Sequence, residues 1–262
     1  MNSKKINFSK YSSIKIGPTK DVLLINLESD FSRLKDYFVL GAANNLLISD
    51  TPPPLMILDK KYSYIKIIDN KLEIGCATPS GKIVSFCKKH NIANFEFMSH
   101  LPGTLGGIIK MNAGVKEYEV FNYLLNIVTH NKTYQKNEIK YGYRFTNISE
   151  IIFSATFQLE YGFSIKKLNR LKSLRNNQPS DPSAGSCFKN PSNFYAGQLI
   201  EEVGLKGYSI GSMQFSTIHA NFLVNNGNGT FKDAMSLINL AKKRVYELKG
   251  VQLEEEITII TI

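Results

Sequence analysis

Cysteine is scarce in this chain of 262 residues, which has only three. Cys76, Cys87 and Cys187 form no CxxC pair and have no histidines at the spacing of a zinc site. This argues against a metal centre and against a disulfide framework. We therefore expect reduced thiols and no bound metal.

Long apolar runs are also missing. No stretch reaches the roughly 20 residues of a membrane-spanning helix, and the start, MNSKKINFSKYSS, lacks the apolar segment of a signal peptide. Hydrophobic residues make up 43% of the chain, enough for one large core or two modest ones. We expect a folded cytoplasmic protein without a membrane partner.

Several motifs of nucleotide-binding and hydrolytic enzymes are absent as well. The chain has no GxGxxG and no HExxH, so neither a Rossmann site nor that kind of zinc hydrolase site is supported. The stretch GCATPSGKI from Gly75 is similar to a P-loop, but it has five residues between its glycines where that motif has four. Ile83 also stands where the motif needs Ser or Thr.

The net charge of +10 could indicate a polyanionic partner. The basic residues are scattered, however, and the densest groups, at 166–167 and 242–244, are separated by ordinary mixed sequence. We therefore favour a solvated basic surface that suits small anions, and expect no nucleic-acid partner.

Hydrophobic patterning predicts a chain of mixed helices and strands. Strands are expected at 22–25, 37–40, 64–68, 72–75, 127–130, 151–159 and 256–262, with a short helix near 29–35. Apolar residues on one face predict a helix over 81–90, with Ser80 as its N-cap. Charge rises after the strand at 151–159, and we place a domain boundary near residue 164.

The clearest predicted helix lies in the last third of the chain. Thr230 and Asp233 have the spacing of a capping box, and Gly250 stands where a C-cap belongs. The residues expected to form its buried stripe are Ala234, Leu237, Ile238, Ala241, Val245 and Leu248.

Two glycine-rich loops are candidates for binding phosphate. They read VLGAANNLLIS at 39–49 and LPGTLGGIIKMNAG at 101–114. Glycine permits positive φ and close backbone approach, and successive exposed N–H groups can hold phosphate oxygens. Each loop taken alone is weak evidence, because glycine pairs more often form ordinary turns.

Together with the segments around them, these loops resemble the MurB reductases. The other matching segments are YGYRF at 141–145, PSAGSCFKNP at 182–191, AGQLIEEVGLKG at 196–207, HANFLVN at 219–225 and VQLEEEITII near the C-terminus. The resemblance covers nearly the whole chain in the family's order, and GSCFKNP is its most specific part.

The resemblance implies an α+β fold and a flavin enzyme. It implies a two-subdomain FAD-binding fold of the vanillyl-alcohol oxidase (PCMH) type over 1–164, with subdomains at about 1–55 and 56–164, and a C-terminal α/β substrate domain over 165–262. The implied reaction is the NADPH-dependent reduction of UDP-N-acetylglucosamine enolpyruvate through noncovalent FAD, in peptidoglycan precursor synthesis. We expect a monomer.

The resemblance also implies roles for individual residues. Ser186 is the implied proton donor, and Arg144 and Glu256 are expected near the substrate carboxyl, where they stabilise the developing enolic charge. The residues implied for FAD are Gly41, Asn44, Asn45, Leu46, Gly103, Thr104, Gly106, Gly107, Asn112 and Gly114. Those implied for the UDP-sugar are Tyr143, Arg175, Lys189, Asn190 and His219.

Each catalytic candidate has an ordinary structural alternative. Ser186 could be a loop or cap serine, Arg144 a surface ion-pair partner, and His219 a buried structural histidine. Glu256 is one of three consecutive glutamates, so the register of the catalytic carboxylate is left open.

The match departs from the family in three places. The N-terminal SSIKIGPTKD has one glycine where a pair is usual. GAANN replaces the usual Gly-Gly-Gly-Ser-Asn, and alanine at positive φ costs about 1 kcal/mol, so altered torsions are expected at Ala42 and Ala43. Only 41 residues separate Arg144 from Ser186, which indicates the short family form without a tyrosine-bearing loop over the substrate.

Two other functions stay open: a flavin-dependent alcohol or hydroxy-acid oxidase or dehydrogenase, and a basic nucleic-acid-binding protein.

Overall fold

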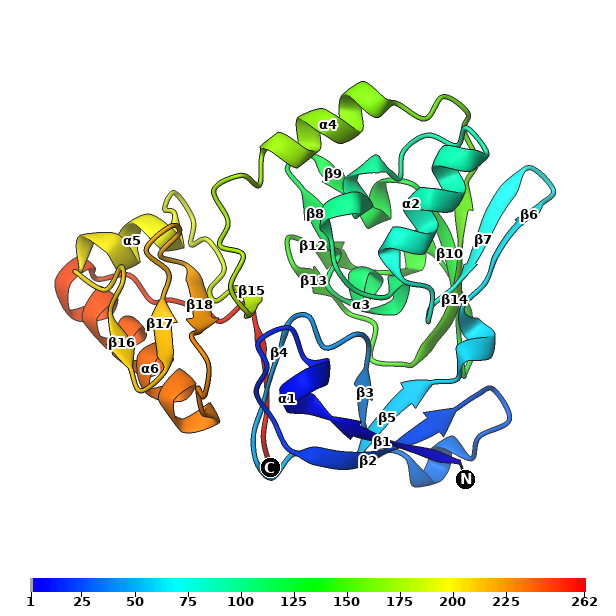
Figure 1. Cartoon of the computed structure of the whole chain (residues 1–262). Coiled ribbons are helices and arrows are strands. Elements are labelled where there is room, and N and C mark those ends of the chain that lie inside the picture. Colours follow the sequence, from blue (N-terminus) through cyan, green and yellow to red (C-terminus); the bar gives the residue numbers. More distant parts are fainter. Residues whose placement is uncertain (1) are drawn as a thin grey trace. The chain divides into compact units, whose positions relative to one another are not determined.

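The computed structural model describes residues 2–262, which form two compact units (Figure 1). Unit 1 is built from the N-terminal residues through Lys4, from Val22–Ala42 and from Pro54–Asn176. Unit 2 is built from Lys5–Asp21, Ala43–Pro53 and Asn177–Ile262. The chain therefore passes between the two units several times.

This division differs from the boundary expected near residue 164. Helix α4 (Ile165–Ser173) belongs to unit 1, because Leu171 is buried in that unit's core and the Ser164 N–H donates to Glu96 Oε1 at 2.9 Å. The segment Ala43–Pro53 belongs to unit 2, because β4 (Leu46–Ile48) pairs in parallel with β19 (Thr258–Ile260).

Unit 1 contains an antiparallel five-stranded sheet in the order β11-β10-β14-β7-β6. Its strands are β6 (Ile65–Ile68), β7 (Lys71–Gly75), β10 (Leu124–Thr129), β11 (Thr133–Gln135) and β14 (Ile152–Gln158). A second sheet, in the order β1-β2-β5-β3, comprises β1 (Ser3–Asn7), β2 (Thr19–Ile25), β3 (Phe38–Leu40) and β5 (Leu55–Leu58). The strands predicted from apolar and β-branched runs are confirmed.

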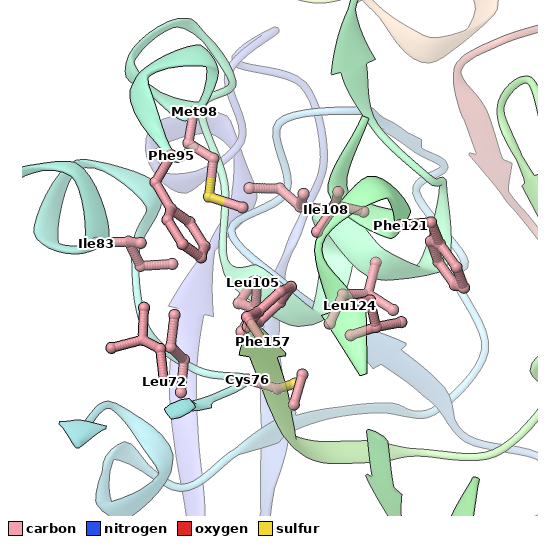
Figure 2. Close-up of a cluster of buried hydrophobic side chains, with 14 of the residues drawn as sticks. Leu72, Cys76, Ile83, Phe95, Met98, Leu105, Ile108, Phe121, Leu124 and Phe157 are labelled. Carbon is pink, nitrogen blue, oxygen red and sulfur yellow. The ribbon is translucent and has the colours of Figure 1, made fainter. Parts of the chain in front are cut away.

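Helices α2 (Ser80–Lys89) and α3 (Leu105–Lys110) contribute side chains to the main core of unit 1. Figure 2 shows Leu105 of α3 beside Phe157 of β14 in this cluster. The prediction that Ser80 caps α2 is wrong, because Pro79 is the N-cap and makes no side-chain capping bond. Ser80 is the first helical residue, and its N–H donates to the Gly103 carbonyl at 2.9 Å.

Unit 2 contains a four-stranded antiparallel sheet with α5 (Ala196–Glu202) and the long helix α6 (Phe231–Lys249). The strands are β15 (Ser183–Ser186), β16 (Ser209–Ile210), β17 (Met213–Phe215) and β18 (Phe222–Asn225), in the order β15-β18-β17-β16. The capping box and the left-handed Gly250 of α6 are confirmed. Its buried stripe is confirmed except at Leu248, which is 66% exposed on the last turn.

The other elements are short. They are α1 (Phe8–Tyr11), β8 (Gly114–Val115), β9 (Tyr118–Glu119), β12 (Tyr141–Gly142), β13 (Phe145–Thr146), and 3-10 turns at Phe31–Arg33, Lys60–Tyr62, Glu96–His100, Val120–Asn122 and Lys136–Glu138. The turn at Phe31–Arg33 takes the place of the helix expected near 29–35. Across residues 2–262, no helix has the length and apolarity to cross a membrane.

Candidate active site

The two glycine-rich loops meet in unit 1. A Cβ added to Gly41 would lie 2.9 Å from Thr104 Oγ1 and 4.0 Å from the Gly107 Cα, so the contact between the loops requires glycine at position 41. Thr104 is the N-cap of α3, and its side chain makes no capping bond within that helix. The Thr104 hydroxyl therefore faces the first loop at the point where the two loops touch.

The glycines of the second loop separate into two kinds. Gly106 and Gly114 are needed for close contact inside the protein: a Cβ on Gly106 would lie 3.3 Å from Cys76, and one on Gly114 would lie 2.8 Å from the Cα of Glu119. Gly107 is exposed, and its added Cβ would meet nothing nearer than Thr104 Oγ1 at 3.9 Å. Open space over Gly107 and the positive φ of Gly103 (144°) suit a ligand that approaches the backbone closely.

The first loop continues in unit 2 through Asn44 and Asn45. Asn44 Nδ2 donates to Ser13 Oγ at 2.5 Å, and Asn45 Nδ2 donates to the Glu256 carbonyl at 2.9 Å. Leu46 is buried, and its strand β4 pairs with β19. Ala43, buried and at φ 51°, carries the strain expected for this loop, whereas Ala42 does not have a positive φ. These residues thus connect the loop to the Glu256 segment.

Asn112 lies just beyond the end of α3 and is fully buried. Its Nδ2 donates to Glu119 Oε2 at 2.8 Å and to the Gly142 carbonyl at 3.1 Å, and its Oδ1 accepts from the Phe121 N–H at 3.4 Å. The side chain is therefore engaged by the protein itself. Any contact between Asn112 and a cofactor would have to come from its backbone.

Arg144 occupies the turn of a two-residue hairpin. Gly142 of β12 pairs with Phe145 of β13, and Tyr143 and Arg144 form the connection. Arg144 has φ 56°, a left-handed conformation that costs about 1–2 kcal/mol for a residue with a Cβ. Its guanidinium lies 4.9 Å from the centre of the half-exposed Tyr143 ring, within cation–π range. The hairpin thus presents a permanent cation and an aromatic ring together.

Ser186 lies at a β-bulge in unit 2. Ser183 pairs with Val224 and Ser186 with Phe222, so two residues of β15 stand opposite one residue of β18. Gly185 adopts φ 83° within the bulge, where an added Cβ would meet no neighbour within 4 Å, so the torsion is what requires glycine. The bulge turns the strand and leaves the side chain of Ser186 half-buried at its end.

The structure distinguishes the three consecutive glutamates. Glu254 pairs with Lys189, and Glu255 pairs with Lys242 at 2.8 Å. The backbone N–H of Glu256 donates to the carbonyl of Cys187 at 2.9 Å. The backbone of Glu256 therefore lies beside the residue that follows Ser186. Burial, with the charges of Glu255 and Glu256, raises the pKa of the Cys187 thiol well above its usual value, so this cysteine stays protonated.

Lys189 and Asn190 follow the serine segment, and both have structural partners. Lys189 contacts Glu254, and Asn190 Oδ1 accepts from the Ala196 N–H at 3.0 Å at the start of α5.

His219 Nδ1 accepts from the Asn221 N–H at 3.2 Å. Burial and, to a smaller extent, the charge of Lys206 lower the pKa of His219, although a backbone hydrogen bond opposes them. These contacts favour the structural alternative for His219.

Two neighbours of the site were not predicted from the sequence. Asn221 Oδ1 accepts from the Phe188 N–H at 2.9 Å and its Nδ2 donates to the Phe188 carbonyl at 2.8 Å, which fixes the chain just after Ser186. His100, beside the second glycine-rich loop, has a lowered pKa because of burial and the charges of Arg175 and Lys172. Arg175 follows α4 in unit 1. The sequence segment HAN at 219–221 contains Asn221, but the contacts of its side chain depend on pairing with a distant segment.

The sequence and the fold of this chain match those of known proteins. A family model described as the C-terminal domain of UDP-N-acetylenolpyruvoylglucosamine reductase matches residues 178–260. The reductase of that name from Helicobacter hepaticus is 47% identical, over 99% of this chain and all of the relative. That from Campylobacter jejuni strain RM1221 is 46% identical, over 97% and 99%. The crystal structure of the Thermus caldophilus enzyme (MurB) matches with a TM-score of 0.88 and 27% identity over the full length of both chains.

These matches define an oxidoreductase with an α+β fold. The chain belongs to the UDP-N-acetylenolpyruvoylglucosamine reductase (MurB) family, whose members act in peptidoglycan precursor synthesis. The resemblance, the fold class and the enzyme class inferred from the sequence are confirmed. The roles of single residues, the cofactor and the compartment stay predictions.

Proposed function

We propose that this reductase acts in the cytoplasm as a monomer and reduces UDP-N-acetylglucosamine enolpyruvate with electrons from NADPH that pass through noncovalent FAD. The observation that carries this proposal is the placement of Ser186 at a bulge, with the backbone of Glu256 bonded to the adjacent Cys187. A serine hydroxyl at the bulge, with a glutamate on the adjoining segment, suits the addition of a proton to a substrate that has just gained a hydride.

The residues that fit FAD are those that leave backbone and small polar groups exposed. Gly103, Thr104 and Gly107 would hold pyrophosphate oxygens, with Gly41 keeping the first loop against Thr104. Asn44 and Asn45 would contribute from the continuation of the first loop. When bound, the flavin supplies the hydride that reaches the methylene carbon of the enolpyruvyl group.

Arg144 would bind the carboxylate of the enolpyruvyl group. Addition of hydride to the methylene carbon leaves negative charge on the neighbouring carbon, and that charge is delocalised into the carboxylate. A guanidinium offers several fixed N–H donors and keeps its charge at any relevant pH, so it stabilises the extra negative charge of this enolate more than it stabilises the starting carboxylate. The Tyr143 ring beside it limits the side chain's freedom.

Ser186 would complete the addition by donating its Oγ proton to the carbon that carries the ether oxygen. The new C–H bond forms as the O–H bond breaks, and the serine oxygen then regains a proton from water. A serine hydroxyl is a weak acid, but an enolate is basic enough to accept its proton. Glu256 would hydrogen-bond at the substrate carboxyl and help to orient it beside the serine.

The UDP-sugar would be bound by donors close to these groups. The first candidates are Lys189 and Asn190, which follow the serine segment, and Tyr143. A further candidate is Arg175, a cation in unit 1. His219 would act through its hydrogen bond to Asn221, which fixes the chain next to Lys189.

The proposal is tested with purified chain loaded with FAD under anaerobic conditions. NADPH should bleach the flavin, and UDP-N-acetylglucosamine enolpyruvate should restore its absorbance, with UDP-N-acetylmuramate as product. Reduction by an alcohol or hydroxy acid but not by NADPH would indicate the oxidase or dehydrogenase function. A folded chain that takes up no FAD would contradict the proposal.

A further inference from the structure

The hairpin that carries Arg144 is tied to the end of the second glycine-rich loop. Asn112 Nδ2 donates to the carbonyl of Gly142 on one strand at 3.1 Å. Thr146 Oγ1, on the other strand, donates to the carbonyl of Lys110 at 2.9 Å. Both strands of the hairpin are thus anchored to residues 110–112, at the C-terminal end of α3.

The orientation of the Asn112 amide is fixed by its neighbours. A carboxylate accepts hydrogen bonds and does not donate them, so the Asn112 NH₂ group must face Glu119 Oε2, 2.8 Å away. The second amide proton then points at Gly142, and the amide oxygen accepts from the Phe121 N–H. Asn112 is fully buried and has φ 42°, a left-handed torsion that asparagine tolerates better than most residues.

We propose that Asn112 is a positioning residue for Arg144, with Glu119 as the group that orients its amide. This role rests on the function proposed above, since Arg144 must bind the substrate carboxylate for its position to matter. A strained left-handed arginine persists only where the surroundings hold it, and the Gly142 carbonyl, two residues before Arg144, is held by Asn112. Asn112 acts through the hairpin and does not touch the reacting atoms.

A second contact, between the rings of Tyr141 and Phe121, lies at the base of the hairpin. Tyr141 stacks on Phe121 with their ring centroids 4.4 Å apart, and Phe121 is the residue whose N–H donates to Asn112. Asn112 therefore connects three segments: the end of α3, the turn at Val120–Asn122 and the arginine hairpin. Loss of its amide should loosen the hairpin without removing any group that would contact the flavin.

The test compares Asn112→Ala and Asn112→Gly with the wild-type holoenzyme in anaerobic half-reactions. Glycine accommodates the positive φ, so agreement between the two variants separates loss of the amide from backbone strain. Both should slow flavin reoxidation by the enolpyruvyl substrate by roughly ten- to hundredfold, as expected for a misplaced binding group. Reduction by NADPH should stay within about threefold of wild type, because Arg144 has no part in that half-reaction.

Asn122→Ala is the matched control. Asn122 also donates from Nδ2 to a backbone carbonyl, that of Glu117 at 2.7 Å, but it makes no contact with the hairpin among the hydrogen bonds of the described residues. It should leave both half-reactions unchanged. In an Arg144→Ala background, Asn112→Ala should slow reoxidation less than about twofold further, because a residue that acts only through Arg144 has nothing left to position.

Equal slowing of the two half-reactions, or full additivity with Arg144→Ala, would overturn the role of Asn112. Should both Asn112 variants fail to fold, Glu119→Gln provides the test, since glutamine no longer fixes the amide orientation. It should slow reoxidation selectively, and an unchanged rate would contradict the proposal. A wild-type chain that NADPH cannot reduce would overturn the proposed function itself, which is a different result.

Discussion

The Glu256 N–H donates to the carbonyl oxygen of Cys187 at 2.9 Å, so the last of three consecutive glutamates lies beside the residue that follows Ser186. The two preceding glutamates pair with lysines on the same unit, Glu254 with Lys189 and Glu255 with Lys242. A single register of this segment thus pairs the carboxylates of Glu254 and Glu255 with lysines and brings the Glu256 backbone to Cys187.

Glutamine substitution should distinguish the three carboxylates. Glu256→Gln should lower kcat for reduction of the enolpyruvyl substrate by at least about tenfold, because the carboxylate near the reacting group is lost. Glu254→Gln and Glu255→Gln should each stay within about threefold of wild type, since partly exposed ion pairs contribute roughly 0–1 kcal/mol. Steady-state kinetics of the three variants tests this, and a large effect at Glu254 or Glu255 would refute the assigned register.

Gly107→Ala should weaken flavin binding without harming the fold. Nothing in the protein would meet the new methyl group within 3.9 Å, and alanine favours helix α3 by up to about 1 kcal/mol, so the Tm should hold or rise. The methyl would occupy space over the backbone that FAD needs, and Kd should rise roughly tenfold or more, equal to about 1.4 kcal/mol.

Gly81→Ala is the matched control for this experiment. Gly81 also lies in a helix, α2, and an added Cβ there would meet no atom within 4 Å. It should raise stability in the same way and leave the Kd for FAD unchanged. Equal Kd values for the two alanine variants would show that Gly107 does not contact the cofactor.

The stability of the chain should fall as His219 becomes protonated. Its pKa is lowered in the folded state by burial and Lys206, so the unfolded chain binds more protons once the pH falls below about 6.5, the ordinary histidine value. The contribution is therefore complete above that pH and is lost progressively below it. His219→Asn, which keeps an acceptor for the Asn221 N–H, should flatten the decrease in unfolding free energy between about pH 7 and 5. Urea titrations at several pH values measure this, and an unchanged slope would contradict it.

The elements predicted well are those that local sequence determines. Helix α6 was predicted from Thr230, Asp233 and Gly250, because caps act within a few residues of the helix end. Ser80 was misassigned because its N–H bonds to Gly103, a partner that periodicity cannot indicate. The exposed Leu248 kept the helical spacing but lies on a turn that the core does not reach.

The site depends more on distant pairing, which limited its prediction. The register of the glutamates follows from the bridge between Phe188 and Glu255, and the Asn45–Glu256 contact joins residues 211 positions apart. Neither is encoded in a local pattern. Family motifs supplied the candidate residues, but only the folded chain shows that Asn112, expected at the cofactor, has its side chain bonded to Glu119 and Gly142.

Ser186→Ala, studied in anaerobic half-reactions, tests the central chemical step most directly. Ser183→Ala, at the other end of β15, is the control. The serine variant should be reduced by NADPH at close to the wild-type rate, and its reoxidation by UDP-N-acetylglucosamine enolpyruvate should slow by about two to four orders of magnitude. If both half-reactions slow equally, or if reoxidation keeps its wild-type rate, Ser186 is not the proton donor.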